Sequence, residues 1–229
     1  MNASTSFVKS LLAQCCLGGI CEWVVCPGAR NMALLQVLAA AEDLVQWTHF
    51  DERSAAFFAL GRIQDMGLPA AVVTTSGTAA AELLPAVVEA YYQRRPLLLL
   101  TADRPADYRG SAAPQAIEQA DMFGIYAPTI DLQTPDDLPE DILEDWDYAS
   151  PLHINVCLPD PDPTWNPGHC DLYPAEPPEE NKFRGSLSGL AQALRFKARH
   201  GLVLMLGGLD PTEQAPALWL ANELKAPVV

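Results

Sequence analysis

The sequence predicts an α/β fold built on a parallel sheet, and three observations carry this prediction. From residue 4 to 160, amphipathic stretches alternate with short apolar runs, which is the pattern of helices that connect buried parallel strands. A loop of turn or helix-capping residues follows each of the first four apolar runs. Hydrophobic residues make up 49% of the chain and charged residues 19%, so the chain has enough apolar area to form a folded core.

The loops that follow the first four expected strands are PGARN, HFDER, TSGT and ADRP. Because the carboxyl ends of parallel strands meet at one edge of a sheet, and ligands bind at that edge, we expect these loops to form a binding site. The expected strands are 23–26, 45–48, 70–74, 97–101, 129–132 and 153–158, and the expected helices are 5–18, 32–42, 52–66 and 78–93.

The last third of the chain has a different organisation. Seven prolines between Pro159 and Pro178 indicate an extended connector, because proline blocks regular structure. A helix at 185–198, a strand at 202–206 and a helix at 211–224 are expected to follow, and the chain stops as another apolar strand begins. About 50 residues with one complete strand cannot close a sheet core, so we expect the truncated start of a second α/β domain.

The charge of the chain excludes one class of function. Fourteen Lys and Arg against 29 Asp and Glu give a formal net charge of -15, which would repel nucleic acid and anionic lipid surfaces. Much of the acidity lies between residues 136 and 147, where it indicates a solvated helix face without chemistry of its own. We therefore expect no nucleic-acid partner.

The N-terminal segment and the cysteines indicate the compartment. The first 20 residues lack the basic and continuous apolar regions of a secretory signal, and no run approaches the roughly 18 apolar residues of a membrane span. The six cysteines form no CxxC pair, so reduced core thiols are expected rather than disulfides or zinc ligands. These features predict a cytoplasmic protein without a membrane span.

The segment THFDERSAAFFALG places Asp51, Glu52 and Arg53 between a strand and an apolar helix. A carboxylate in the first turn of a helix complements the helix dipole, which is a purely structural interpretation of Glu52. The apolar surroundings suggest instead that Glu52 is partly desolvated, which would favour its protonated form and suit it to proton exchange. The residues alone leave both interpretations open.

Two further features belong to the same predicted edge. The turn Thr75-Ser76-Gly77-Thr78 is either an ordinary capped turn or, because Gly77 and the alanines after it are small, a place where a flat ring approaches the backbone. Arg30, Arg104 and Arg109 are either surface charges or a cluster that binds a substrate with several carboxylates.

Five motifs in order, CPGARN, THFDERSAAFFALG, TTSGTAAAELLPAVVEA, LLLLTADRPAD and QAIEQADMFG, resemble the pyrimidine-binding domain of thiamine-diphosphate enzymes. The TADRP and QAI segments look specifically like the 2-succinyl-5-enolpyruvyl-6-hydroxy-3-cyclohexene-1-carboxylate synthases. The resemblance runs from about residue 5 to 159, and the part after the connector is similar to the start of that family's central domain. It implies a pyrimidine-binding domain at 1–159, a Pro-rich linker at 160–183 and an incomplete central α/β domain at 184–229.

The resemblance also implies a chemistry. Such a transferase uses thiamine diphosphate and Mg²⁺ to decarboxylate 2-oxoglutarate, and it adds the succinyl semialdehyde carbanion to isochorismate in the biosynthesis of menaquinone, vitamin K2. Glu52 matches the glutamate that contacts N1′ of the aminopyrimidine and promotes removal of the thiazolium C2 proton. By the same resemblance the cofactor contacts include Gly28, Ser76 and Gly77, and the substrate contacts are Arg30, Arg104 and Gln115.

The chain departs from the family in three respects. Ala29 stands where the family commonly has Ser and Pro114 where it has Asn, so two hydrogen bonds to substrate are lost. The GDG-to-Asn segment that holds Mg²⁺ and the diphosphate would lie beyond residue 229, so the resemblance implies no metal ligand within this chain. Because the family's site lies between two subunits, it implies a homo-oligomer, a dimer or tetramer, and an inactive isolated chain.

Two other hypotheses remain open from the sequence. The chain could be a non-catalytic ligand-binding or regulatory domain that kept the fold and lost the chemistry. It could also belong to a thiamine-diphosphate enzyme that acts on another 2-oxo acid.

Overall fold

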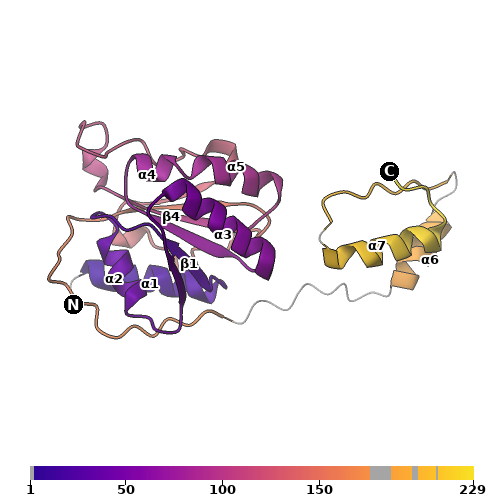
Figure 1. The fold of residues 1–229 in the computed structure, drawn as a ribbon, viewed down its shortest axis with the longest axis horizontal. Helices are drawn as coiled ribbons and strands as arrows, with labels where there is room; N and C mark the ends of the chain where they lie inside the picture. The colour runs from indigo at the N-terminus through magenta and orange to yellow at the C-terminus, as the bar shows by residue number, and fades with distance from the viewer. Residues whose placement is uncertain (1–2, 176–186, 198–200, 210) are drawn as a thin grey trace. The chain divides into compact units, whose positions relative to one another are not determined.

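The computed structural model describes residues 3–175, 187–197, 201–209 and 211–229. The chain divides into two compact units, residues 1–178 and residues 179–229. The first unit is a six-stranded parallel sheet in the order β2-β1-β3-β4-β6-β5, with helices on both faces (Figure 1). The predicted α/β fold with a parallel sheet is therefore confirmed.

The strands lie close to their expected positions. The second, third and fifth strands have the predicted bounds, the first and sixth begin one residue earlier, and the fourth continues two residues further. The strands are β1 (Glu22–Val25), β2 (Val45–Thr48), β3 (Ala70–Thr74), β4 (Leu97–Asp103), β5 (Thr129–Leu132) and β6 (Leu152–Cys157).

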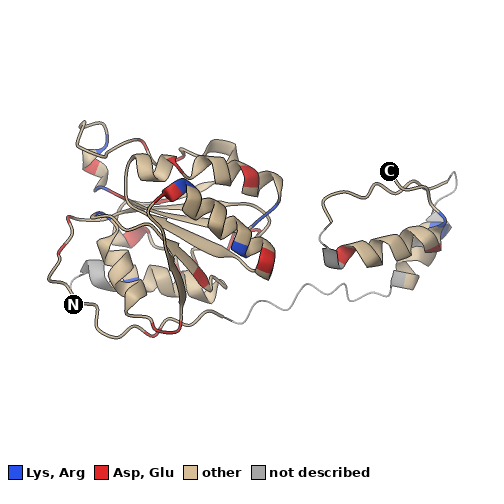
Figure 2. Ribbon diagram, viewed as in Figure 1, with Lys and Arg blue, Asp and Glu red and all other residues tan. Residues whose placement is uncertain are grey.

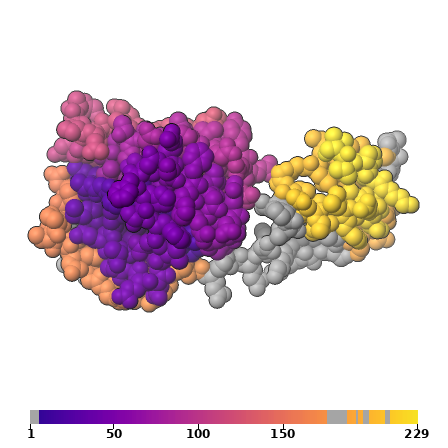
Figure 3. All heavy atoms as spheres, viewed as in Figure 1, coloured from indigo at the N-terminus to yellow at the C-terminus, as the bar shows by residue number. Residues whose placement is uncertain are grey.

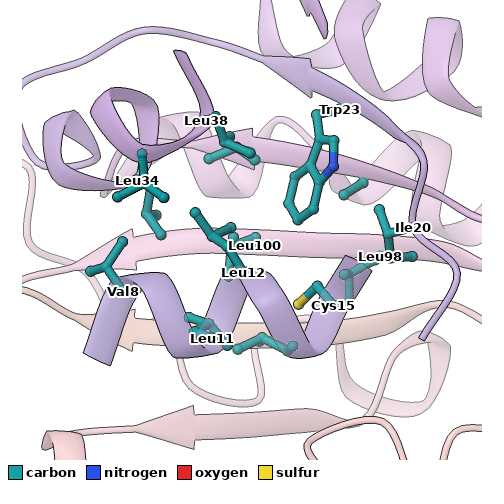
Figure 4. Packing of buried hydrophobic residues seen from close by; sticks show 14 of the residues in the cluster. Val8, Leu11, Leu12, Cys15, Ile20, Trp23, Leu34, Leu38, Leu98 and Leu100 are labelled. Carbon is teal, nitrogen blue, oxygen red and sulfur yellow. The ribbon is translucent and has the colours of Figure 1, made fainter. Parts of the chain in front are cut away.

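One face of the sheet is covered by α1 (Ala3–Leu17) and α2 (Met32–Ala39). Alternate residues of a strand point to opposite faces, so Trp23 of β1 and Leu98 and Leu100 of β4 turn toward these helices (Figure 4). They pack in one cluster with apolar side chains of both helices, and Trp23 is completely buried. This large-residue core fixes the position of the loop between β1 and α2.

The opposite face is covered by α3 (Glu52–Met66), α4 (Thr78–Ala81) and α5 (Leu84–Tyr92) (Figure 1). Its core uses many alanines, so the helices lie close to the sheet. The Arg62 guanidinium on α3 donates two hydrogen bonds, of 2.9 and 2.7 Å, to the buried Glu22 carboxylate at the start of β1. This ion pair fixes α3, and hence its first turn, against the sheet.

The predicted continuous helix at 78–93 is wrong, because the structure divides it into α4 and α5. Pro85 lies in the first turn of α5, where its missing N–H costs no helical hydrogen bond. An uninterrupted helix would place Pro85 in the interior, where it would remove a hydrogen bond to the preceding turn. Proline therefore starts a new helix within this segment.

Two other expectations are corrected. The strand β2 is exposed along its length rather than buried, because it forms the outer edge of the sheet. The acidic run from 136 to 147 is not a helix face: only residues 135–137 form a short 3-10 helix, and turns follow. There the Asp137 carboxylate accepts hydrogen bonds from the backbone N–H groups of Gln133 and Thr134, which favours a turn.

The described part of the predicted linker, residues 160–175, lies along the first unit without helix or strand. Lys9 Nζ on α1 donates to the Pro167 carbonyl at 2.7 Å, and Gln36 Nε2 on α2 donates to the Trp165 carbonyl at 2.9 Å. Cys170 and Leu172 are buried in the core under α1 and α2. Residues 176–183 lie outside the described residues, and the division of the chain at 159 and 183 stays a prediction.

The second unit contains α6 (Leu187–Lys197) and α7 (Pro211–Leu224), joined by an Arg195–Glu223 ion pair of 3.0 Å. The helix predicted at 211–224 is confirmed, while residues 185, 186 and 198 of the other predicted helix lie outside the described residues. The predicted strand at 202–206 is wrong in extent, because only an isolated parallel bridge joins Leu204 to Val228. A strand over residues 202–206 would need a neighbouring strand of similar length to pair its backbone hydrogen-bonding groups.

Figure 2 marks the charged residues along the first unit. Acidic residues are scattered over its loops and helix ends (Figure 2). Atoms from the first half of the chain cover most of the viewed face (Figure 3). In the described ranges, no helix is long and apolar enough to cross a membrane.

Candidate functional site

The order of the strands places a switch point of the fold between β1 and β3. The chain leaves β1 toward β2 on one side and continues from β3 toward β4 on the other side. In parallel sheets, the loops at the carboxyl ends of two such strands diverge to opposite faces, and ligands bind between them. The loops concerned are PGARN and TSGT, and both were predicted to form part of a binding site.

These two loops contact each other at Gly28. A Cβ atom on Gly28 would lie 2.5 Å from the Thr75 Cβ, so this position has room for glycine alone. The buried Asn31 holds the first loop: its Oδ1 accepts from the Gly28 N–H at 2.9 Å and its Nδ2 donates to the Cys26 carbonyl at 2.9 Å. The close approach of the two backbones is therefore built into the fold.

The turn after β3 is buried and has an unusual backbone. Ser76 is 2% exposed, and Gly77 has a φ of +80°, which side-chain-bearing residues rarely adopt. A Cβ on Gly77 would also lie 3.0 Å from the Gln115 carbonyl oxygen. The hydroxyl of the neighbouring Thr74 is buried without a hydrogen-bond partner within the described residues. The turn thus offers a narrow backbone surface, which fits a flat ring.

Glu52 begins α3, and its neighbour Asp51 performs the capping role. The Asp51 carboxylate accepts a hydrogen bond of 2.7 Å from the Ser54 N–H. The half-buried Glu52 carboxylate has neither a hydrogen bond nor an ion pair within the part of the chain that the structure describes. The helix is therefore capped without Glu52, which favours the functional interpretation of this residue.

The end of β1 lies within the electrostatic reach of this carboxylate. Burial, and then the negative charges of Glu52 and Asp51, raise the pKa of the Cys26 thiol to about 12. Cys26 therefore stays a neutral thiol and does not act as a nucleophile at neutral pH. The loop that leads to Glu52 lies at the carboxyl end of β1, where the His49 N–H donates to the Val25 carbonyl at 2.9 Å.

The three arginines of the predicted carboxylate-binding cluster each have a partner of their own. Arg30 is 8% exposed and donates to the Leu158 carbonyl at 3.1 Å and to the Asp160 carboxylate at 3.0 Å. It lines a cavity of about 230 Å³ together with Trp165 and residues 158–162. Asp160 is highly exposed, so an incoming carboxylate could replace it at the Arg30 guanidinium at small cost.

Arg104 and the segment before Gln115 are joined directly. The Arg104 guanidinium donates two hydrogen bonds to the Pro114 carbonyl, one of them from Nε at 3.0 Å. Gln115 is exposed and has a φ of +54°. The structure therefore brings Gln115 beside Gly77 and ties its segment to Arg104, while Arg30 faces residues 158–160.

Arg109 has a structural position. Both of its terminal nitrogens donate to the Asp131 carboxylate at 2.7 Å. Although burial raises the pKa of Asp131, hydrogen bonds from Arg109, Asn155 and Gln133 lower it to about 2. Both terminal nitrogens of Arg109 are engaged by this ion pair, so we assign it no substrate contact.

A buried polar network that was not predicted from the sequence lies on the other side of the turn. Gln119, His153 and Asn155 are 0% exposed, and the Gly77 N–H donates to Gln119 Oε1 at 2.7 Å. Burial lowers the pKa of His153 to about 3, against the opposing charge of Asp131, so its ring is neutral. A polar residue within an apolar strand, as in LHINVC, was the one available signal of such a network.

The residues that the structure describes contain no group of three or more His, Cys, Asp and Glu that could hold a metal ion. All six cysteines are free thiols, and five of them are buried.

A parallel sheet with a narrow glycine turn at its switch point has the form of a ligand-binding α/β domain. The family model described as "Thiamine pyrophosphate enzyme, N-terminal TPP binding domain" matches residues 6–122. The chain belongs to this family.

The relatives carry one name. The chain is 90% identical over 229 residues to 2-succinyl-5-enolpyruvyl-6-hydroxy-3-cyclohexene-1-carboxylate synthase of Akkermansia muciniphila. The matched region covers all of this chain and 43% of the relative. It is 37% identical to the synthase of that name from Geobacillus thermodenitrificans, over all of this chain and 42% of the relative. For the Bdellovibrio bacteriovorus synthase the values are 36% identity, 92% of this chain and 40% of the relative. The chain thus spans less than half the length of these curated relatives.

Proposed function

We propose that this chain forms the pyrimidine side of the active site of a thiamine-diphosphate-dependent 2-succinyl-5-enolpyruvyl-6-hydroxy-3-cyclohexene-1-carboxylate synthase. The whole enzyme would decarboxylate 2-oxoglutarate and join the remaining four-carbon unit to isochorismate in menaquinone biosynthesis. The observation that carries the proposal is the Glu52 carboxylate at the start of α3, which has no hydrogen bond or ion pair within the described residues. The name of the 90% identical relative supports the choice of reaction.

The residues of the chain fit a bound aminopyrimidine. Glu52 would hold a proton at a ring nitrogen, because its carboxylate is free to accept one and is placed by a helix that Asp51 already caps. Gly28, Ser76 and Gly77 would form the narrow backbone surface on which the ring lies. When bound, thiamine diphosphate supplies the nucleophilic carbon and the electron sink for decarboxylation.

The substrate side of the proposal rests on Arg30, Arg104 and Gln115. Both substrates carry carboxylates, which guanidinium groups bind with charge-assisted hydrogen bonds. Arg30 would exchange its exposed partner Asp160 for a substrate carboxylate. Arg104 would orient Gln115 through the Pro114 carbonyl, so Pro114 takes part through its backbone, which any residue at this position supplies.

Several features of the proposal lie outside this chain. Residues of a diphosphate-binding domain would hold Mg²⁺ and the diphosphate, and the site would lie between subunits of a dimer or tetramer. Exposed aromatic side chains on α3 and α5, among them Phe57 and Tyr92, support a partner on that face. We also infer a cytoplasmic location from the soluble substrates of the reaction.

The experiment uses the longer protein in which a diphosphate-binding domain follows this chain. Purified protein with thiamine diphosphate and Mg²⁺ is given 2-oxoglutarate and isochorismate, and the product is identified by mass spectrometry. We expect the condensed product and CO₂ in equal amounts. Turnover of another 2-oxo acid in place of 2-oxoglutarate would replace the substrate assignment, and absence of all decarboxylation would favour a non-catalytic domain.

A further inference from the structure

The buried side chain of Gln119 connects two predicted parts of the site. It follows the Gln115 segment in the sequence, and its Oε1 accepts a hydrogen bond of 2.7 Å from the Gly77 N–H. Gly77 comes just before α4, where a backbone N–H has no acceptor within the helix. Gln119 therefore supplies the partner that the turn requires.

The orientation of the Gln119 amide is determined by charged residues further inside. Asn155 Nδ2 donates to the carboxylates of Asp131 at 2.8 Å and Asp103 at 3.1 Å, and an ionised carboxylate only accepts hydrogen bonds. Asn155 Oδ1 must then face the other way, where it accepts from Gln119 Nε2 at 3.0 Å. As a result Gln119 Oε1 is turned toward Gly77.

The hydroxyl of Thr101 completes the same network. It donates to Asn155 Oδ1 at 3.0 Å, so it accepts from His153 Nε2 at 2.7 Å. His153 Nδ1 then accepts from the Thr129 hydroxyl at 2.9 Å, which is the arrangement of a neutral ring. Every member has a partner, and a buried network that is fully satisfied is rigid.

We propose that Gln119 is a positioning residue, which holds the Ser76-Gly77 turn and the Gln115 segment in one fixed arrangement. The two segments touch, since a Cβ on Gly77 would lie 3.0 Å from the Gln115 carbonyl oxygen. This inference rests on the proposed function in one respect: the proposed function assigns a cofactor to the turn and a substrate to the Gln115 segment. The carboxylates of Asp103 and Asp131, with Arg109 behind them, set the direction of the hydrogen bonds that reach the turn.

The first test is amide hydrogen exchange of the 229-residue chain. In the unaltered chain Gly77 should exchange slowly, although it lies outside a helix. Gln119→Met keeps the side-chain length and removes all hydrogen bonds of the amide, including the one to Gly77, so we expect the protection of Gly77 to fall by about threefold to tenfold. Gln46 lies on the edge strand β2, and Gln46→Met removes its side-chain hydrogen bond to the Leu38 carbonyl in α2. This variant should leave the exchange of Gly77 unchanged.

The same data separate positioning from general destabilisation. A positioning role changes Gly77 more than the core amides of β3 and β4, whereas a merely structural role lowers the protection of all of them equally. If Gln119→Met does not fold, the unaltered chain still tests the proposal through the scalar coupling across the hydrogen bond between Gly77 N and Gln119 Cδ. Rapid exchange of Gly77, or absence of this coupling, would overturn the inference.

The second test uses the longer protein and measures cofactor binding and turnover separately. We expect Gln119→Met to lower kcat/KM about tenfold and Gln46→Met to leave it unchanged. Unchanged kinetics in Gln119→Met, with active unaltered protein, would overturn the positioning role and leave the proposed function intact. If the unaltered protein is inactive, the proposed function fails while the Gly77 measurements still decide the role of Gln119.

Discussion

The two halves of the carboxyl edge of the sheet treat polar groups in opposite ways. Beside β4, β5 and β6, the carboxylates of Asp103 and Asp131 are bound by Arg109 and Asn155. Beside β1 and β3, the Glu52 carboxylate has no such partner among the described residues. Polar groups that have hydrogen-bond partners stabilise a fold, whereas a carboxylate that is fixed in place without a partner can bind a ligand.

The largest expected effect is on the unsatisfied side. In the longer protein, Glu52→Gln removes the group that exchanges the proton and keeps the size of the side chain. We expect the rate of C2 proton exchange of bound thiamine diphosphate to fall by roughly 100-fold or more, the usual range for loss of an acid–base group. Deuterium exchange followed by NMR measures this rate.

The neighbouring residue gives a control for this prediction. Asp51→Asn keeps a good helix cap and should leave the exchange rate unchanged. Equal rates in Glu52→Gln and the unaltered enzyme would return Glu52 to the role of a helix-start carboxylate.

The next effect lies on the saturated side. Arg109→Met leaves two partly buried carboxylates without their cation, and breaking a buried ion pair costs roughly 3 kcal/mol. Urea unfolding of the 229-residue chain should show this loss in the first unit. Arg53→Met, at an exposed position, should change the free energy of unfolding by no more than about 0.5 kcal/mol. Equal decreases in the free energy of unfolding for Arg109→Met and Arg53→Met would contradict a structural role of Arg109.

A smaller effect on the free energy of unfolding is expected where the PGARN and TSGT loops meet. Gly28→Ala places a Cβ 2.5 Å from the Thr75 Cβ, and overpacking of this kind costs about 1–3 kcal/mol. Gly61→Ala in α3 meets no atom within 4 Å and should stabilise the chain by about 0.5–1 kcal/mol. Thermal unfolding compares the two, and a stable Gly28→Ala variant would show that the loops can separate.

The smallest effect concerns the pH dependence of stability. The pKa of Asp131 is lowered to about 2, so its ion pair stabilises the folded chain fully above about pH 4, the ordinary value for Asp. This contribution is lost as the pH falls toward about 2. The stability difference between the unaltered chain and Asp131→Asn should therefore narrow over that interval, and a difference that grows on acidification would contradict the assignment.

Local signals explain how much of the fold was predictable. Helix α3 has its predicted bounds because Asp51 caps its start and Gly67, with a φ of +69°, ends it. The division between α4 and α5 was missed because the apolar pattern continues across Pro85. Strand β2 has its predicted bounds but is exposed, since the order of strands in a sheet depends on contacts between distant segments.

The candidate site divides in the same way. The loops with Gly28, Glu52 and Gly77 were identifiable because each follows an apolar strand directly. The network of Thr101, Gln119, His153 and Asn155 was not, because its members lie on segments up to 54 residues apart that meet only when β6 enters between β4 and β5. The partners of Arg30 and Arg109 were hidden for the same reason.

The most direct test of this contrast compares two isosteric substitutions in the 229-residue chain at neutral pH. The free energy of unfolding is measured in urea for Glu52→Gln and for Asp131→Asn. We predict a loss of no more than about 1 kcal/mol for Glu52→Gln, which gives up only a first-turn charge. Asp131→Asn should lose roughly 2 kcal/mol or more, because its carboxylate holds Arg109 and Asn155. An equal or larger loss for Glu52→Gln would show that Glu52 is a structural residue and would contradict the account.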